Sequence, residues 1–173
     1  MPVTQPLSSN LDAILNQCVT MIEGLGLTYT PPGGTPTLIP VVKRKLSKKD
    51  ETIDPLPLIT VWPIRDAENA RWLSFSGWLR SAYNIGIAII AANDGDEFSN
   101  IPTLATWRQS IRQLFQGPAL GNLTTITDSL GNVSKILDVD SSKDEFLDNK
   151  MLPDLYDYQT VGVFINIVEP SAA

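Results

Sequence analysis

Residues 71–92, RWLSFSGWLRSAYNIGIAIIAA, carry the strongest fold signal in this chain. In their second half, Ile85, Ile87 and Ile89 alternate with smaller residues, and a period of two is that of a β-strand. Because the residues between these isoleucines are mostly small and apolar as well, we expect this strand to be packed on both faces.

The first half of the same stretch has a different pattern. Leu73, Phe75 and Leu79 alternate with serine and arginine, which predicts a strand with one solvated face. Gly77 within this run predicts a bulge or a sharp bend. The stretch ends at the turn sequence Asn93-Asp94-Gly95-Asp96.

Two amphipathic helices are predicted, one on each side of this stretch. The first spans residues 10–24, after a Ser8-Ser9-Asn10 segment suited to an N-cap, and Gly24 and Gly26 end it in a left-handed conformation. The second begins after Asn100, with Pro102 in its first turn, and stops at Gly117-Pro118. Their apolar stripes are Leu11, Ile14, Leu15, Cys18, Val19, Ile22 and Leu25, and Leu104, Trp107, Ile111, Leu114 and Phe115.

Further strands surround these elements. We predict strands over 37–46 and 56–64, a bend at 66–69, a hairpin of 123–130 with 133–139 around Gly131-Asn132, and a final strand over 160–167. The sum is an α+β fold, with a mixed, mostly antiparallel sheet of about six or seven strands and two main helices packed on one face. We expect residues 1–173 to form one domain, with mobile loops near 30–36, 47–55 and 138–150.

Composition narrows the functional class. Apolar residues make up 43% and charged residues 18%, as in soluble globular proteins, and no run approaches the roughly 20 apolar residues of a transmembrane helix. The N-terminal sequence lacks the pattern of a signal peptide, so we expect synthesis in the cytoplasm and no membrane partner. A net charge of -6 argues against a grip on nucleic acid, but it suits a surface past which DNA slides.

Catalytic chemistry has little support. The chain has no histidine, so Ser74, Ser76, Ser81 and Cys18 have no imidazole to activate them, and a single cysteine cannot build a zinc site. Three neighbouring carboxylates, Asp94, Asp96 and Glu97, suit a hard cation, but they also suit an acidic turn before a helix, which we favour. We therefore predict no enzyme activity, no metal and no cofactor.

Two groups of residues are candidates for protein contacts. The first is a basic segment that fits an acidic partner or a nucleic-acid backbone, or is only a solvated strand end; it contains Lys43, Arg44, Lys45, Lys48 and Lys49. The second is Trp72 and Trp78 beside Arg80, because exposed aromatic residues next to arginine are typical of contact surfaces; core packing is the alternative.

The order of elements and three segments resemble the tail terminator proteins of tailed bacteriophages, the tail-completion family. The segments are Tyr83 to Ile90 (YNIGIAII), Thr106 to Phe115 (TWRQSIRQLF) and Asp154 to Gln159 (DLYDYQ). The resemblance covers most of the chain, and it rests on architecture more than on signature residues.

This resemblance implies a structural virion protein. Copies of such a protein form a hexameric ring that caps the tail tube, stops its polymerisation and joins it to the neck or connector. In contractile tails the ring also meets the sheath, and DNA passes through its channel without specific binding. The loops 47–55 and 138–148 are then candidates for docking or for lining the channel.

Other functions stay open. A head–tail connector, a stopper or a tail-tube subunit has similar small domains and the same assembly logic. From other classes, a carboxylate-based metal-dependent hydrolase would use Asp94, Asp96 and Glu97, and a peptide-binding adaptor would be a monomer with an exposed strand edge or aromatic groove.

Overall fold

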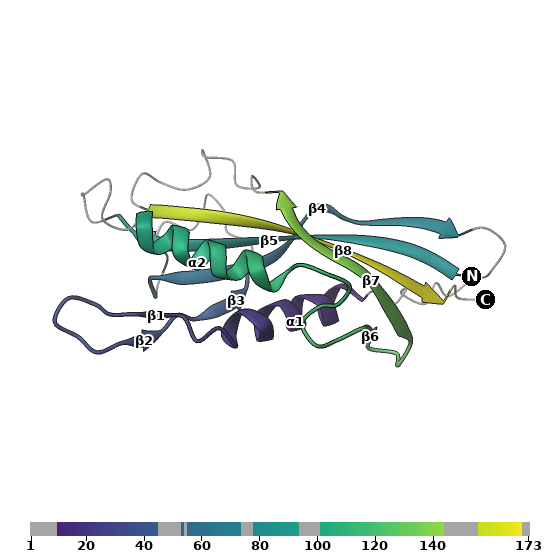
Figure 1. The fold of residues 1–173 in the computed structure, drawn as a ribbon, viewed down its shortest axis with the longest axis horizontal. Coiled ribbons are helices and arrows are strands. Elements are labelled where there is room, and N and C mark those ends of the chain that lie inside the picture. Colours follow the sequence, from purple (N-terminus) through teal and green to yellow (C-terminus); the bar gives the residue numbers. More distant parts are fainter. Residues whose placement is uncertain are drawn as a thin grey trace, which may run out of the picture.

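The fold consists of two helices on a curved sheet. The computed structural model describes residues 10–44, 53, 55–73, 78–93, 101–143 and 156–170, with the backbone alone for part of them. Within these ranges the helices are α1 (Leu11–Glu23) and α2 (Ile101–Leu114). They lie beside a six-stranded sheet and a smaller two-stranded one (Figure 1).

The large sheet is mixed, and only one of its strand pairs is parallel. Its order is β3-β4-β5-β8-β7-β6, and β3 pairs with β4 in parallel while every other neighbouring pair is antiparallel. Its strands are β3 (Val41–Lys43), β4 (Leu58–Leu73), β5 (Trp78–Ala92), β6 (Thr125–Thr127), β7 (Val133–Lys143) and β8 (Tyr156–Pro170). The small sheet joins β1 (Thr28–Tyr29) to β2 (Thr37–Leu38). The predicted α+β class, with a mostly antiparallel sheet, is confirmed.

Strand β5 lies in the middle of the sheet and is buried on both faces. It pairs with β4 on one side and with β8 along its full length on the other. Every residue of β5 from Ile85 to Ala91 is buried, as the alternation of isoleucine with small residues predicted. Gly86 lies opposite Gly162 of β8 and Trp62 of β4, so the indole packs over the glycine.

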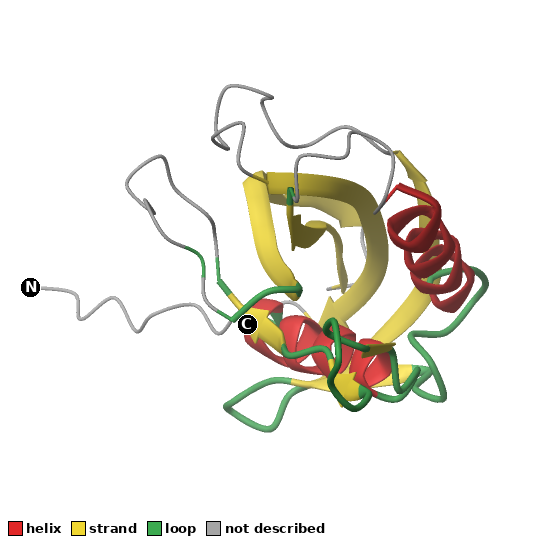
Figure 2. Cartoon of the chain, turned by 90° about the vertical axis from the view of Figure 1, so that its left-hand side faces the viewer, coloured by secondary structure: helices red, strands yellow, loops and turns green. Residues whose placement is uncertain are grey.

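One face of the sheet carries the main core. Alternate residues of β5 and β8, including Ile85, Ile87, Val163 and Ile165, pack against both helices. The helices contribute buried apolar residues at their predicted stripe positions, namely Ile14, Leu15, Cys18, Ile22, Leu104, Trp107 and Ile111. Figure 2 shows both helices on the same side of the curved strands. Because the periods of 3.6 and 2 each place one stripe on this side, the layers bury it together.

The other face has a smaller apolar cluster. Leu58, Trp62, Ala88 and Ile90 are buried there together with Ile53, which precedes β4. The backbone N–H of Ile53 donates to the Tyr156 hydroxyl oxygen over 3.1 Å, so Ile53 is held against β8. This contact explains why the even-numbered residues at this end of β5 are also buried.

The predicted strand nearest the N-terminus has different bounds in the structure. The strand expected over 37–46 is interrupted, because β2 ends at Leu38 and β3 begins at Val41. Ile39 donates to Leu27 on one side, and the Pro40 carbonyl accepts from Ile59 on the other, so the chain passes between the two sheets here. Proline has no N–H to donate to a neighbouring strand, so Pro40 fits a position where the chain leaves one sheet and enters the other.

The bend expected at 66–69 is wrong, because β4 continues through it to Leu73. The register slips between Pro63 and Glu68: those positions pair with Ile85 and Tyr83, and the extra β4 residues form an irregularity of the bulge kind. Leu73 then pairs with Trp78, so the single run expected over 73–79 is instead the end of β4 and the start of β5. Gly77 lies outside the described residues, as do the turn residues 94–96 and Asn100.

The acidic loop expected from residue 138 is also wrong over 138–143, which belongs to β7. Asp138 and Asp140 are exposed, whereas Val139 and Ser141 are buried, which is the period of two of a strand with one solvated face. Residues 144–150 lie outside the described part. The predicted hairpin, in contrast, is confirmed by the antiparallel pairing of β6 with β7.

The two ends of α1 differ from their predicted caps. Asn10 is in a helical conformation and its side chain makes no capping hydrogen bond, because its amide reaches across to the sheet. Its Nδ2 donates to Ser134 Oγ (3.0 Å) and to Glu169 Oε2 (2.9 Å), and Glu169 also pairs with the Ser81 hydroxyl. At the other end, Gly26 rather than Gly24 has the left-handed conformation.

We predict that Gly86→Ala destabilises the protein by about 1–3 kcal/mol, because a core that is already packed cannot accept an added methyl without strain. A Cβ at Gly86 would lie 2.8 Å from Trp62 Cε2 and Cζ2. Urea unfolding followed by tryptophan fluorescence measures the change. Gly24→Ala is the matched control, since Gly24 already has helical angles and alanine there should be close to neutral. Equal stability of the two variants would contradict the packing of Trp62 on β5.

A second prediction concerns the buried amide of Asn10. Asn10→Asp puts a carboxylate beside Glu169 in place of a donor, and we expect a loss of about 1–3 kcal/mol at neutral pH. The like charge raises the folded-state pKa of the paired carboxyls, so the loss should shrink as the pH falls. Unfolding curves between neutral and acidic pH test this. The exposed control Asn122→Asp should show no such trend, and a pH-independent loss would count against the contact.

Candidate interaction surfaces

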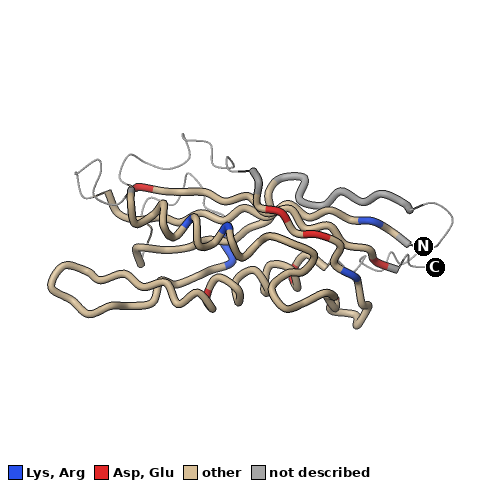
Figure 3. Tube along the Cα trace, in the orientation of Figure 1, with Lys and Arg blue, Asp and Glu red and all other residues tan. Residues whose placement is uncertain are grey.

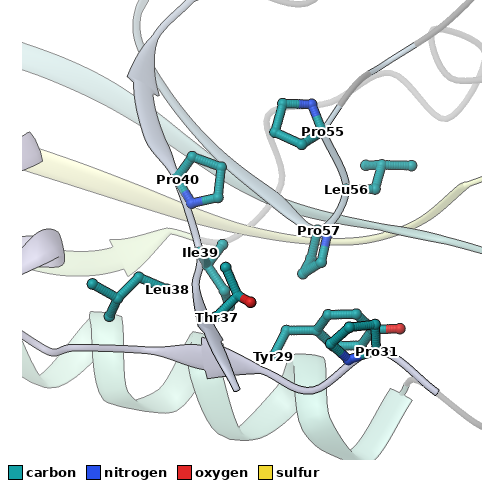
Figure 4. Close-up of a pocket in the computed structure, with 9 residues that line it drawn as sticks. All are labelled: Tyr29, Pro31, Thr37, Leu38, Ile39, Pro40, Pro55, Leu56 and Pro57. Carbon is teal, nitrogen blue, oxygen red and sulfur yellow. The ribbon is translucent and has the colours of Figure 1, made fainter. Parts of the chain in front are cut away.

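An apolar pocket lies at the end of the molecule where the small sheet meets the start of β4. Its volume is about 340 Å³. Figure 4 shows Tyr29 of β1 and Pro31, from the segment after β1, on one side, and Pro55 and Leu56 on the other. The full lining is Tyr29, Pro31, Thr37, Leu38, Ile39, Pro40, Pro55, Leu56 and Pro57. We call this the proline pocket.

The walls of the proline pocket are stiff. Four of its lining residues are prolines, whose rings fix φ and offer no backbone donor. Leu38 is 65% exposed, although it is a large aliphatic residue. A preformed apolar cavity with an exposed leucine favours the binding of an apolar side chain, because little conformational entropy is lost on binding.

A second apolar surface is the turn between β6 and β7, here called the β6–β7 turn (residues 128–133). Asp128 organises it: its Oδ1 accepts from the backbone N–H groups of Leu130 (2.8 Å) and Asn132 (2.9 Å). Gly131 has φ +86°, which a side chain would strain. The turn therefore holds Leu130 and Val133 outward, at 70% and 53% exposure.

These two surfaces share an absence of charge. Residues 24–42 contain no Asp, Glu, Lys or Arg, and residues 113–134 contain one, Asp128, whose carboxylate is used within the turn. Figure 3 shows the β1–β2 arm without a charged residue. Figure 1 places this arm and the β6–β7 turn at opposite ends of the long axis. The composition of both segments is that of contact surfaces, whose centres are depleted of charge.

The predicted basic segment is described only in part. Lys43 Nζ lies 2.9 Å from Asp12 Oδ1 and 2.6 Å from Asn16 Oδ1, so it is attached to α1. The Lys43 hydrogen bond and charge lower the pKa of the Asp12 carboxyl. Arg44 is exposed beside Lys43, whereas Lys45, Lys48 and Lys49 lie outside the described residues. A basic docking patch therefore stays a prediction.

The predicted tryptophan surface falls at the far end of the β4–β5 hairpin. Trp72 pairs with Leu79, Trp78 pairs with Leu73, and Arg80 is exposed. The side chains of both tryptophans lie outside the described part of the structure, so their role in contacts also stays a prediction. Trp62 and Trp107 are buried.

The residues considered for catalysis or metal binding are either buried or outside the described residues. Cys18 is fully buried, and burial raises the pKa of its thiol to about 12, so it is protonated and unreactive at neutral pH. Ser81 is buried in the cluster with Glu169, while Ser74, Ser76, Asp94, Asp96 and Glu97 lie outside the described residues.

The described ranges contain neither a group of metal ligands nor a membrane-spanning helix. Within them, no three His, Cys, Asp or Glu side chains come together as a set of metal ligands. No helix in the same ranges has the length and apolar character needed to cross a membrane.

Comparison with known proteins finds no protein-family model and no curated protein that matches this chain.

We predict that Lys43→Gln raises the pKa of Asp12 toward its ordinary value of 3.8. The lowered pKa stabilises the fold above that value, and this contribution is lost as the pH falls through the folded-state pKa. Because both side chains are exposed, the loss of stability should stay below about 1 kcal/mol. A carboxyl NMR titration measures the shift. Lys135→Gln is the control, and an unchanged Asp12 titration in Lys43→Gln would contradict the ion pair.

Proposed function

We propose that this protein is a structural virion component, a tail terminator that assembles into a ring at the head-proximal end of the tail tube. The ring stops tube polymerisation and connects the tail to the neck or connector. The observation that carries this proposal is the pair of charge-free apolar surfaces at opposite ends of one rigid subunit. Two different surfaces on one subunit are what head-to-tail assembly requires, and such assembly closes into a ring when the rotation between copies permits.

The architecture suits this role. The central strand is buried on both faces, so the subunit can act as a stiff spacer between its two ends. Surfaces without charge allow copies with a net charge of -6 to come together without placing like charges in contact. The resemblance in the segments 83–90, 106–115 and 154–159 favours a tail terminator over other ring proteins, and a hexameric ring follows from it.

The excess of negative charge fits the passage of DNA. A channel lined by carboxylates repels the phosphate backbone, so the DNA slides without being held. Asp138 and Asp140 are exposed on alternate positions of β7, and we assign them to the channel wall. Under this proposal the tail-tube protein, the neck protein and, in a contractile tail, the sheath are the partners, and the protein resides in the virion after its synthesis in the host cytoplasm.

A peptide-binding adaptor is the second candidate, because the proline pocket is a preformed site for an apolar side chain. In that function the subunit stays a monomer, and the β6–β7 turn takes no part in binding. A connector, stopper or tube subunit would share the ring but differ in its position on the virion.

The proposed function predicts that the 18.9 kDa chain forms a closed ring with a central hole and that it arrests growing tail tubes. Light scattering with size-exclusion chromatography, at low and high concentration, gives the mass, and negative-stain imaging gives the shape. The second measurement adds the protein to purified tube subunits and records tube length. A monomer at all concentrations that leaves tube length unchanged would contradict the proposal, whereas a ring without effect on tubes would indicate another neck component.

A further inference from the structure

We propose that neighbouring copies join by insertion of the β6–β7 turn of one copy into the proline pocket of the next. Leu130 and Val133 would enter the pocket beside Tyr29 and Leu38. This inference rests on the proposed function, since it names the contact that builds the ring, and the partner to which it commits is a second copy of this chain.

The distribution of exposed apolar residues leads to this pairing. In the described part of the chain, the large apolar side chains that are exposed are Leu38, Leu123, Leu130 and Val133. All four lie within the two segments without exposed charge, 24–42 and 113–134. Leu38 lines a concave site, and Leu130 and Val133 project from a convex one, so the two surfaces are complementary in shape as well as in chemistry.

A single subunit cannot make this contact with itself. The β1–β2 arm and the β6–β7 turn lie at opposite ends of the long axis, with α1 between them (Figure 1). The contact must therefore form between copies and must be heterologous, and each copy keeps one free pocket and one free turn until the ring closes.

The lack of charge in the pocket fits the β6–β7 turn of a second copy as the occupant. A basic partner, which the acidic chain would attract elsewhere, finds no carboxylate in the proline pocket. The β6–β7 turn of another copy carries one charge, the Asp128 carboxylate, which is buried and accepts hydrogen bonds on both oxygens within the turn. A projection whose single carboxylate is already buried and hydrogen-bonded can enter an uncharged pocket without bringing an exposed charge into the contact.

Both parts are also rigid before they meet. The pocket walls contain four prolines, and the turn is fixed by three hydrogen bonds to Asp128 and by the left-handed Gly131. Since neither part has to be ordered on binding, the burial of two aliphatic side chains is not offset by a large loss of entropy.

The test is a mixing experiment with single-cysteine reporters. Leu38→Cys and Leu130→Cys are made separately in the full chain, and both positions are exposed, so folding should be retained and is checked by circular dichroism. The native Cys18 is buried and contributes no background. A short bis-maleimide is added to each variant alone and to the mixture.

We expect cross-linked dimers in the mixture and none in either variant alone, because a heterologous contact brings position 38 of one copy next to position 130 of another. The double variant should give a ladder of higher multimers. Gln109→Cys, an exposed position on α2, replaces one partner as the control and should give no product with Leu38→Cys. In addition, Leu130→Asp and Leu38→Asp should each weaken self-association by about tenfold or more, since each removes a buried aliphatic contact.

The outcomes separate this inference from the proposed function. If the wild-type protein forms rings but the mixture gives no cross-link, the pairing is wrong while the ring stands. If either variant cross-links alone as well as in the mixture, the contact is isologous and the pairing is again wrong. If the wild-type protein is a monomer and the mixture gives no product, the pairing is wrong, and tube arrest alone decides the proposed function.

Discussion

The structure depends on the burial of strand β5 on both of its faces. Isoleucines on one face reach the helices, while glycine and alanine on the other leave room for Trp62 and for the cluster around Ile53. A central strand buried in this way needs partners on both edges, and β4 and β8 supply them over most of its length. The remaining elements are arranged around this three-stranded centre.

Attachment to that centre explains the positions of the helices. α2 is held to β8 by the Arg108 side chain, whose Nε donates to the Thr160 carbonyl over 3.0 Å, and by the apolar face that contains Leu104 and Ile111. α1 begins at the polar contact of Asn10 with Ser134 and Glu169, which joins the start of the helix to β7 and β8. With these ends fixed, the small sheet extends along the long axis, and the β6–β7 turn projects from the lower edge of the molecule toward the other end (Figure 1).

The separate positions of the small sheet and the β6–β7 turn are the basis of the proposed function. The two projecting parts contain one charged residue between them, the buried Asp128, and they expose the aliphatic residues Leu38, Leu130 and Val133. The other charged residues lie in other segments of the chain, so the contacts proposed for assembly and most of the charge belong to separate regions. Under the proposed function, this separation would let an acidic protein associate with itself and present carboxylates to DNA.

Local sequence was sufficient for much of the fold. Helical spacing defined both helices to within a few residues, and alternation defined the two-sided burial of β5, because periodicity directly reflects which faces are buried. The other features of the fold and the pocket depend on contacts between segments that are distant in the sequence. The bulge in β4 and the strand at 138–143 are stabilised by pairing with β5 and β8, and the pocket combines residues 29–40 with 55–57, so local patterns could not reveal them. Gly131-Asn132 predicted a turn, but the exposure of Leu130 depends on where the rest of the chain lies.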